Sequence, residues 1–180
     1  MSLDDLTLVV RAREGDVRAF EALARRHQAA LYRTAVRVTG DPGEAEDALQ
    51  EAMLDAWRHL DRFRGESAFS TWMYRLVTNR CVAAVRRRRP VPASDAGDRA
   101  AAPDSPERAA LLDLELAALG QAVQDLPDDL RVCWVLRELE GLGYSEIAEI
   151  AEITGAGETA VRGRIHRARV RLAGVMRTWR

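Results

Sequence analysis

Arginine and aromatic side chains alternate between positions 57 and 74, and this combination suits unpaired nucleic acid. Aromatic faces stack on exposed bases, typically contributing about 1–3 kcal/mol per base, while guanidinium groups follow the phosphates. Half of the aromatic residues of the chain fall here: Trp57, Phe63, Phe69, Trp72 and Tyr74. Arginines lie among and after them: Arg58, Arg62, Arg64, Arg75 and Arg80. The competing interpretation is that Phe69, Trp72 and Tyr74 only close a small hydrophobic core.

A second group of arginines lies near the C-terminus, on the second of two expected helices that a short turn separates. Residues 149–169 read EIAEITGAGETAVRGRIHRAR, in which an apolar helix ends at Gly155 and Thr159 caps the next helix. That helix carries four arginines: Arg162, Arg164, Arg167 and Arg169. The layout is typical of a helix-turn-helix, whose second helix enters the major groove, where arginine binds guanine or phosphate. Arginine-rich exposed faces without this function are also common.

Charge is distributed unevenly along the chain, although the net charge is only −1. Residues 75–89 and 162–180 contain arginines and no acidic residue, whereas residues 41–55 contain six acidic residues and no arginine. A polyanion senses this distribution and not the net charge. The side chains of Asp47, Gln50 and Glu51 could form hydrogen bonds and ion pairs with arginines on a partner protein. The alternative is that this acidic helix face is only solvated.

The segments that carry these acidic and basic residues have apolar residues at helical spacing. Asp41 as N-cap, Pro42 in the first turn and Glu44 three residues after the cap predict a helix start. Its core stripe is Ala45, Ala48, Ala52, Ala56 and Leu60. Another helix is expected from about Ser70, with Trp72, Arg75, Asn79, Ala83 and Arg86 on one face and Met73, Val77, Cys81 and Ala84 on another. No stretch alternates with period two, which predicts an all-α fold.

Proline marks the boundary between two small helical domains. Four of the six prolines lie between Pro90 and Pro106, and such a segment is expected to be an extended, flexible linker. The domains are therefore expected at 1–89 and 107–180, with a linker at 90–106. In the second domain Leu112, Leu116, Leu119 and Val123 have helical spacing, and Leu126-Pro127 breaks the helix before Leu130–Leu139.

Several functional classes find little support in the sequence. The chain has no apolar run of about 18–20 residues and no signal-peptide start, so we expect a cytoplasmic protein without membrane insertion. Cys81 and Cys133 are too far apart for a metal-spaced pair and are expected to be small buried hydrophobes. The three histidines are scattered and no glycine-rich phosphate loop occurs. We therefore expect no cofactor, no metal and no enzymatic activity.

Both basic segments resemble the extracytoplasmic-function sigma factors of the sigma-70 family. Residues from Leu126-Pro127 through Arg131, Glu140-Gly141-Leu142, Tyr144, Glu146-Ile147-Ala148 and Arg167-Ala168-Arg169 resemble region four. Asp47-Ala48-x-Gln50-Glu51, Ala56-Trp57-Arg58 and the following aromatic segment resemble region two. The resemblance implies a protein that binds core RNA polymerase and directs it to promoter DNA.

The resemblance also implies roles for individual residues. In region two, the acidic helix would bind the β′ clamp helices, and the loop 63–69 with the next helix would capture a flipped minus-ten base. Region four would bind the β flap and read the minus-thirty-five element. The implied core-binding residues are Asp47, Gln50, Glu51 and Trp57. The implied minus-ten residues are Phe63, Arg64, Phe69, Trp72, Arg75, Asn79, Arg80 and Arg86. The implied minus-thirty-five residues are Thr159, Arg162, Gly163, Arg164, His166 and Arg167. An inhibitory anti-sigma factor is a further implied partner.

The sequence departs from the family pattern in three places. Gly163 stands where the family usually has Ser, and Ala83 stands where it often has Asp. Glu-Ile-Ala occurs twice in tandem, at 146–148 and 149–151, which adds three residues to the first helix of the motif and predicts a local bulge or a lengthened helix. A stand-alone helix-turn-helix regulator is the alternative function, but it would not need an acidic helix followed by an aromatic loop.

Overall fold

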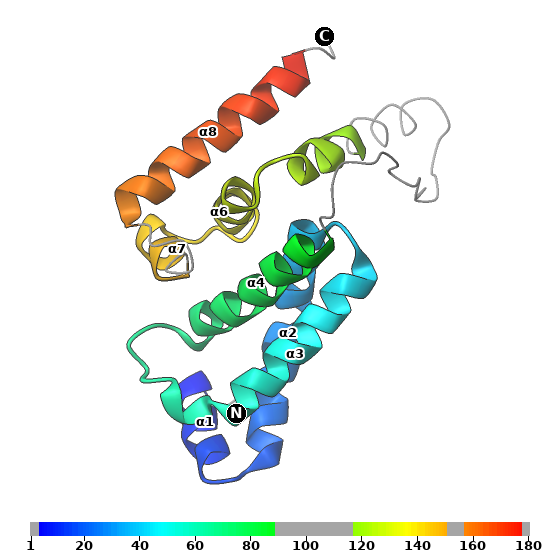
Figure 1. Cartoon of the computed structure of the whole chain (residues 1–180). Helices are drawn as coiled ribbons and strands as arrows, with labels where there is room; N and C mark the ends of the chain where they lie inside the picture. Colours follow the sequence, from blue (N-terminus) through cyan, green and yellow to red (C-terminus); the bar gives the residue numbers. More distant parts are fainter. Residues whose placement is uncertain (1–3, 89–116, 151–156, 178–180) are drawn as a thin grey trace, which may run out of the picture.

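The computed structural model describes residues 4–88, 117–150 and 157–177, and every regular element in these ranges is a helix. This confirms the all-α expectation. Figure 1 shows two groups of helices, one from each half of the chain. The first group contains α1 (Asp5–Arg13), α2 (Val17–Thr39), α3 (Pro42–Arg58), the 3-10 turn η1 (Leu60–Arg62) and α4 (Phe69–Arg88). The second contains the helical residues 117–124, α6 (Asp128–Glu138), α7 (Tyr144–Ile150) and α8 (Glu158–Arg177). We call these groups the first and second modules.

Side-chain caps fix the helix starts of the first module. The Asp41 carboxylate accepts hydrogen bonds from the backbone N–H groups of Gly43 at 2.8 Å and Glu44 at 3.0 Å. This confirms the predicted start of α3, because the cap satisfies donors that have no partner within the helix. The preceding helix α2 ends at Thr39 and is capped by Gly40, which has a left-handed backbone with φ of 74°. Glycine adopts this conformation without steric cost.

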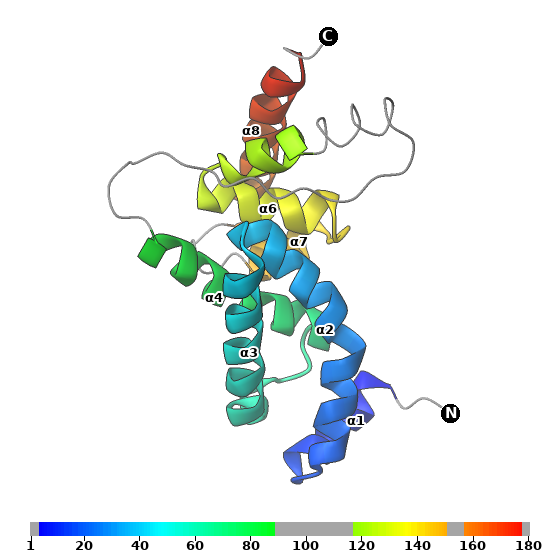
Figure 2. The ribbon, with the colours of Figure 1, turned by 90° about the vertical axis from the view of Figure 1, so that its right-hand side faces the viewer.

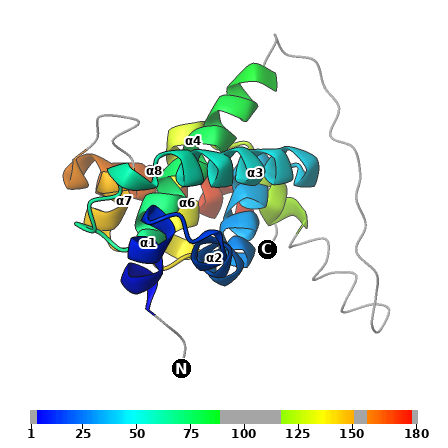
Figure 3. The same cartoon turned by 90° about the horizontal axis from the view of Figure 1, so that it is seen from below.

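Alanine brings the central helices of the first module together. Ala45, Ala48, Ala52 and Ala56 are all buried on one face of α3, as the sequence predicted. Small residues on one face allow the neighbouring helices α2 and α4 to approach closely, and all three helices contact one another. Figure 3 shows this bundle from below, with α1 beside α2. On α4 the predicted packing face is buried at Met73, Val77 and Cys81.

One helix of the first module was not expected from the sequence. In α1 the side chains of Leu8, Val9 and Ala12 are buried. The Asp4 carboxylate caps the helix by accepting a 2.7 Å hydrogen bond from the Thr7 backbone N–H. The cap and the apolar spacing were both visible in the sequence, but the segment is short. Its contacts with α2 and η1 stabilise it in the folded chain.

The second module is held together by α6 and α8. The predicted break at Leu126-Pro127 is confirmed, because α6 begins directly after Pro127. A single apolar stripe of α8 is buried at Val161, Ile165, Ala168 and Leu172. The expectation that Thr159 caps this helix is wrong, because α8 already begins at Glu158. Gly155 and the end of the second Glu-Ile-Ala copy lie outside the described residues.

The two modules contact each other through α2 with α6 and through α4 with α7. Figures 1 and 2 show these pairs side by side in both orientations. The expected linker 90–106 lies outside the described residues. Within the described part of the chain, none of the helices combines the length and apolar character that crossing a bilayer requires.

Candidate polymerase and nucleic-acid interfaces

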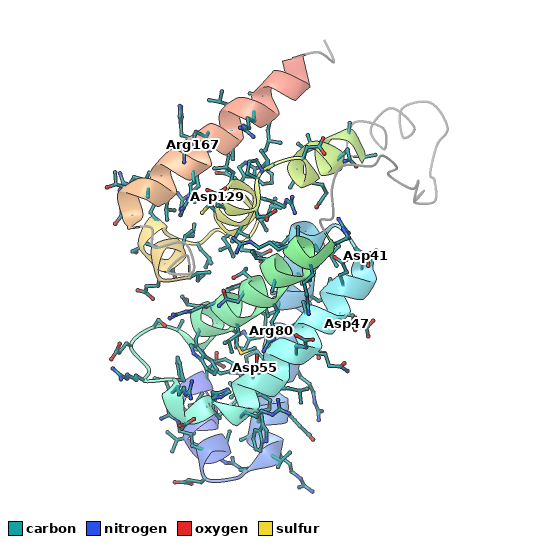
Figure 4. The ribbon with its side chains drawn as sticks, in the orientation of Figure 1. Asp41, Asp47, Asp55, Arg80, Asp129 and Arg167 are labelled. Carbon is teal, nitrogen blue, oxygen red and sulfur yellow. The ribbon has the colours of Figure 1, made fainter. Side chains whose placement is uncertain are left out.

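The acidic face of α3 is open to solvent. Asp47, Gln50 and Glu51 are all exposed, and Figure 4 shows Asp47 on the outer side of the helix. Trp57 follows on the same helix, is 38% exposed and packs its ring 5.1 Å from that of Phe20. The structure therefore brings the four expected core-binding residues together on one helix, with a large apolar side chain at its C-terminal end.

Arg80 joins this acidic helix and not the arginines with which the sequence grouped it. Its guanidinium pairs with the Asp55 carboxylate and with Glu51, the latter at 3.1 Å. Figure 4 shows Arg80 of α4 directed toward Asp55 of α3. The hydrogen bond from Arg80 to Asp55 raises the pKa of Arg80 above its usual value. The Arg80 side chain thus connects α4 to α3 and is still 40% exposed, so its expected contact with minus-ten DNA stays a prediction.

A pocket of about 550 Å³ lies where the loop after η1 meets the start of α4. Its lining residues include Arg62, Arg64, Trp72 and Arg75. The loop that the sequence led us to expect as the base-capture loop therefore forms one side of a pocket, and arginines and Trp72 are among the residues that line it. The cavity is large enough to receive a planar group such as a base beside Trp72.

Two of the expected stacking residues serve as supports instead. Phe63 and Phe69 are each only 3% exposed, which corrects the expectation that they offer free faces to bases. Their ring centroids lie 5.4 Å and 5.8 Å from that of Trp72, respectively. Aromatic pairs at such separations are mutually stabilising. Trp72 is half-buried, so the two phenylalanines orient it while part of its ring faces the pocket.

The face of α4 that was predicted to lie opposite the packing face carries solvent-accessible side chains. Arg75 and Arg86 are exposed and Asn79 is half-buried, while the opposite face packs into the core. An asparagine amide at this position has two donors and an acceptor for a base edge. Of the expected minus-ten residues, those with accessible side-chain surface are Arg64, Trp72, Arg75, Asn79, Arg80 and Arg86.

The N-terminal half of α8 presents most of the expected minus-thirty-five residues. Arg162, His166 and Arg167 are exposed, and Figure 4 shows Arg167 on this helix. Thr159 is exposed as well, in the first turn. Gly163 is half-buried, and a Cβ there would lie 3.3 Å from Nη1 of Arg167. Because Gly163 has no side chain, the Arg167 guanidinium can lie close to the helix backbone at this position.

Two arginines of α8 have partners within the second module. Arg164 pairs with Asp129 of α6 at 3.1 Å, and its side chain is only 14% exposed. Arg164 is therefore directed toward α6 in this structure, and its expected contact with DNA stays a prediction. Arg162 pairs with Glu158 at 2.6 Å and lies 4.8 Å from the centroid of the Tyr144 ring. These contacts orient Arg162 without burying it.

Sequence reasoning missed the polar residues that connect the modules. Glu140, in the turn after α6, accepts hydrogen bonds from Arg37 Nη1 at 2.9 Å and from the Tyr74 hydroxyl at 3.0 Å. Burial and the nearby Glu140 carboxylate raise the pKa of Tyr74 to about 12. Glu140 lies in the quoted family motif, but its partners are 66 and 103 positions away along the chain. No local signal could have identified them.

Neither cysteine is part of a metal site or a reactive site in the described structure. Cys81 and Cys133 are both buried and free. Burial raises the pKa of Cys81 to about 12 and that of Cys133 to about 11, so both thiols stay protonated at neutral pH. Among the described residues, no group of three or more His, Cys, Asp or Glu side chains is arranged to hold a metal ion.

Comparison with known proteins identifies the family. Residues 23–91 match the family Sigma-70 region 2, and residues 116–172 match the family Sigma-70, region 4. The RNA polymerase sigma-H factor of Pseudomonas aeruginosa is 43% identical over 92% of this chain and 90% of its own length. The ECF RNA polymerase sigma-E factor of Escherichia coli K12 is 37% identical over 93% of this chain and 91% of its own length.

Solved structures agree with this result. The structure of CnrH in complex with the cytosolic domain of CnrY matches with a TM-score of 0.72 and 28% identity, over 97% of both chains. The sigma factor RpoE in complex with the anti-sigma factor NepR, from Bartonella quintana, shares the fold with a TM-score of 0.69 and 22% identity, over 91% of this chain and 100% of that one. The chain belongs to the sigma-70 family, in its extracytoplasmic-function group. This is a family of transcription initiation factors and not of known enzymes.

Proposed function

We propose that this chain binds core RNA polymerase and directs it to promoters by reading a minus-ten and a minus-thirty-five element. The observation that carries the proposal is the pairing of both family modules in one chain, in the family order. The first module combines an exposed acidic face with an arginine-lined pocket, which a stand-alone helix-turn-helix regulator does not need. We assign the modules to residues 1–89 and 107–180, joined by residues 90–106.

The acidic face of α3 is the proposed core-binding surface. Asp47, Gln50 and Glu51 offer exposed acceptors to arginines of the β′ clamp helices, and charge-assisted hydrogen bonds of this kind are short and strong. Exposed Trp57 supplies the large apolar contact that interfaces favour. The second module would contact the β flap.

The pocket beside Trp72 is the proposed minus-ten site. A base that leaves the duplex costs a few kcal/mol in lost pairing and stacking. Stacking on Trp72 recovers about 1–3 kcal/mol per base, and the arginines at 64, 75 and 86 attract the phosphates. Phe63 and Phe69 hold Trp72 in place, and Asn79 would read a base edge.

The exposed N-terminal half of α8 is the proposed minus-thirty-five reader. Arg162, His166 and Arg167 would face the major groove, with Thr159 and Gly163 close to the DNA backbone. Arg164 would act indirectly, because its bond to Asp129 fixes α8 on α6.

An anti-sigma factor is the proposed regulator. RpoE, which shares this fold, was solved in complex with the anti-sigma factor NepR. We propose that a protein of this class controls access of the present chain to core polymerase.

The experiment is co-purification of charge-reversed variants with core polymerase. Asp47→Arg and Gln50→Arg should each abolish association, since each places a cation opposite a basic partner surface. Glu21→Arg is the matched control, because Glu21 is exposed on α2 and pairs only with neighbouring Arg25 among the contacts described. Helical circular dichroism should be unchanged in all three variants. Wild-type recovery of core by Asp47→Arg would reject the assignment of this surface.

A further inference from the structure

A histidine occupies the stripe of α2 that faces the core of the first module. His27 lies four residues after Leu23 and four before Leu31, and both leucines are buried. The His27 side chain itself is only 18% exposed. A polar group in such a position costs free energy unless it has a hydrogen-bond partner. His27 therefore needs a partner from a neighbouring element.

Helix α1 supplies that partner. Nε2 of His27 donates to Oδ2 of Asp5, in the first turn of α1, at 2.8 Å, and the Arg26 guanidinium pairs with the other oxygen of the same carboxylate. Helices α1 and α2 pack side by side, as Figure 3 shows. Asp5 thus holds the imidazole ring by one nitrogen. Asp5 precedes residues 23–91, which match Sigma-70 region 2, so this contact comes from a helix outside the matched residues.

The same imidazole ring supports the aromatic cluster beside the pocket. Its centroid lies 5.5 Å from that of Phe69, with the two rings tilted by 52°. The Phe69 centroid in turn lies 5.8 Å from that of Trp72 and 5.7 Å from that of Phe63. Aromatic pairs at such separations are mutually stabilising. A continuous series of contacts therefore runs from Asp5 through His27 and Phe69 to Trp72.

Phe69 connects the buried part of this series to the accessible part. Phe69 and Trp72 are three residues apart in the first turn of α4, so their side chains lie on the same face of the helix. Phe69 is 3% exposed, whereas Trp72 is half-buried and lines the pocket. A functional side chain is oriented well only when the residues behind it are themselves fixed by packing and hydrogen bonds. Without the imidazole of His27, one side of Phe69 would lose its support.

We propose that His27, held by Asp5, is a positioning residue for Trp72 and acts through Phe69. His27 does not line the pocket, so its effect on a captured base is indirect. The inference rests on the proposed function, since Trp72 stacks on a base only if this pocket is the minus-ten site. It goes beyond that function by giving α1 and the imidazole of α2 a part in minus-ten recognition.

Binding of two DNA probes by the chain assembled with core polymerase tests this inference. One probe is a fork with an unpaired minus-ten strand, and the other is a duplex that carries only the minus-thirty-five element. His27→Ala should bind the fork roughly 3- to 10-fold more weakly, with duplex binding unchanged. His27→Phe keeps a ring against Phe69 and should bind the fork within about twofold of the wild type. Equal losses on both probes, or wild-type fork binding by His27→Ala, would overturn the inference.

A double-mutant comparison tests the contribution of Asp5. Asp5→Ala should weaken fork binding by about two- to fourfold, because the imidazole loses its partner. The same change made in His27→Phe should have no further effect, since a phenyl ring does not need the carboxylate. An equal effect of Asp5→Ala in both backgrounds would mean that Asp5 does not act through His27. Asp5→Ala also decides if His27→Ala fails to fold, because the Asp5 side chain is partly exposed.

Glu14→Ala is the matched control for Asp5→Ala. Glu14 follows the last residue of α1 and carries the same charge. Within the part of the chain that the structure describes, its exposed side chain makes no hydrogen bond or ion pair. Glu14→Ala should leave the binding of both probes unchanged. A loss of fork binding in this variant equal to that in Asp5→Ala would reject the specific role of Asp5.

Near-ultraviolet circular dichroism separates this inference from the proposed function. The tryptophan bands should change in His27→Ala, and the same change should be absent when Trp72→Phe is the starting protein, because Trp72 is the reporter. Identical tryptophan bands in the wild type and His27→Ala would contradict the positioning role. A wild-type complex that binds the fork no better than fully paired DNA of the same sequence would contradict the proposed function, and the dichroism would still decide the positioning role.

Discussion

The two arginine-rich helices α4 and α8 have the same length, 20 residues each, but different surroundings. Helix α4 packs against α2, α3 and α7 and has nine buried residues, which leaves a narrower exposed face. Helix α8 packs against α6 and α7 and buries a single stripe, which leaves a wide exposed face. A narrow face beside a pocket suits one extruded base, whereas a wide convex face suits the major groove of a duplex. The difference teaches that arginine content alone does not define the mode of binding.

The same comparison applies to individual arginines. Each helix has two arginines that pair with another helix of its own module: Arg80 with Asp55 and Arg88 with Glu44 in α4, and Arg164 with Asp129 and Arg169 with Glu138 in α8. Arg75 and Arg86 on α4, and Arg162 and Arg167 on α8, keep exposed side chains. The ion pairs thus attach each helix to its own module, while the exposed arginines stay accessible to a partner.

The largest expected effect is the loss of duplex reading by α8. Arg162→Ala and Arg167→Ala should each weaken use of the minus-thirty-five element by about 1–3 kcal/mol if they read bases, or reduce the salt dependence if they bind phosphate. The measurement is transcription from promoters with intact and altered minus-thirty-five elements. If the variant with both changes transcribes at the wild-type level, α8 does not read the duplex, and the proposed difference in function between α4 and α8 is wrong.

Removal of the stacking face in the first module should have the next largest effect. Trp72→Ala should reduce binding to forked DNA with an unpaired minus-ten strand, by about 1–3 kcal/mol for each stacked base. Trp72→Phe keeps an aromatic face and should retain most of the binding. Binding of the duplex minus-thirty-five element should be unchanged in both variants. An equal loss on both probes would mean that Trp72 only supports the fold.

The next effect is a loss of stability at alkaline pH, caused by the one buried cysteine thiol in the core of each module. Because the folded-state pKa of each thiol lies above its ordinary value of 9.0, its contribution to stability is complete below pH 9 and is lost as the pH rises toward the folded value. Each thiol should lower the free energy of unfolding by up to about 1.4 kcal/mol per pH unit above pH 9. Urea unfolding at pH 9 and pH 10 should show a shallower decline in Cys81→Ala and in Cys133→Ala. The same decline in wild type and both variants would exclude the thiols as its cause.

The smallest expected effect concerns Gly163. Gly163→Ala places a Cβ 3.3 Å from Arg167 Nη1, so the guanidinium must move by a few tenths of an ångström. Gly174→Ala is the control, because a Cβ there meets no atom within 4 Å. Both changes should stabilise α8 by roughly 0.5–1 kcal/mol. Only Gly163→Ala should alter the preference at the base that Arg167 reads, measured with a panel of minus-thirty-five variants.

Local signals in the sequence predicted much of the fold. The Asp41 cap with Pro42 located the start of α3, and the alanine stripe identified its buried face. The exposed face of α4 followed from helical spacing, whereas the exposed positions of α8 followed from the family resemblance. The pairing of Arg80 with Asp55 could not be predicted, because it depends on how two helices cross. The burial of Phe63 and Phe69 likewise depends on packing of the loop, and the contacts of Glu140 depend on how the two modules meet.

Run-off transcription with purified core polymerase and the upstream region of the gene tests the central claim most directly. The claim is that one chain carries both a polymerase-binding, base-capturing module and a duplex-reading module. We predict that core polymerase produces a transcript of defined start only when this chain is added, and that changing either promoter element removes it. A transcript pattern identical with and without the chain would contradict the account.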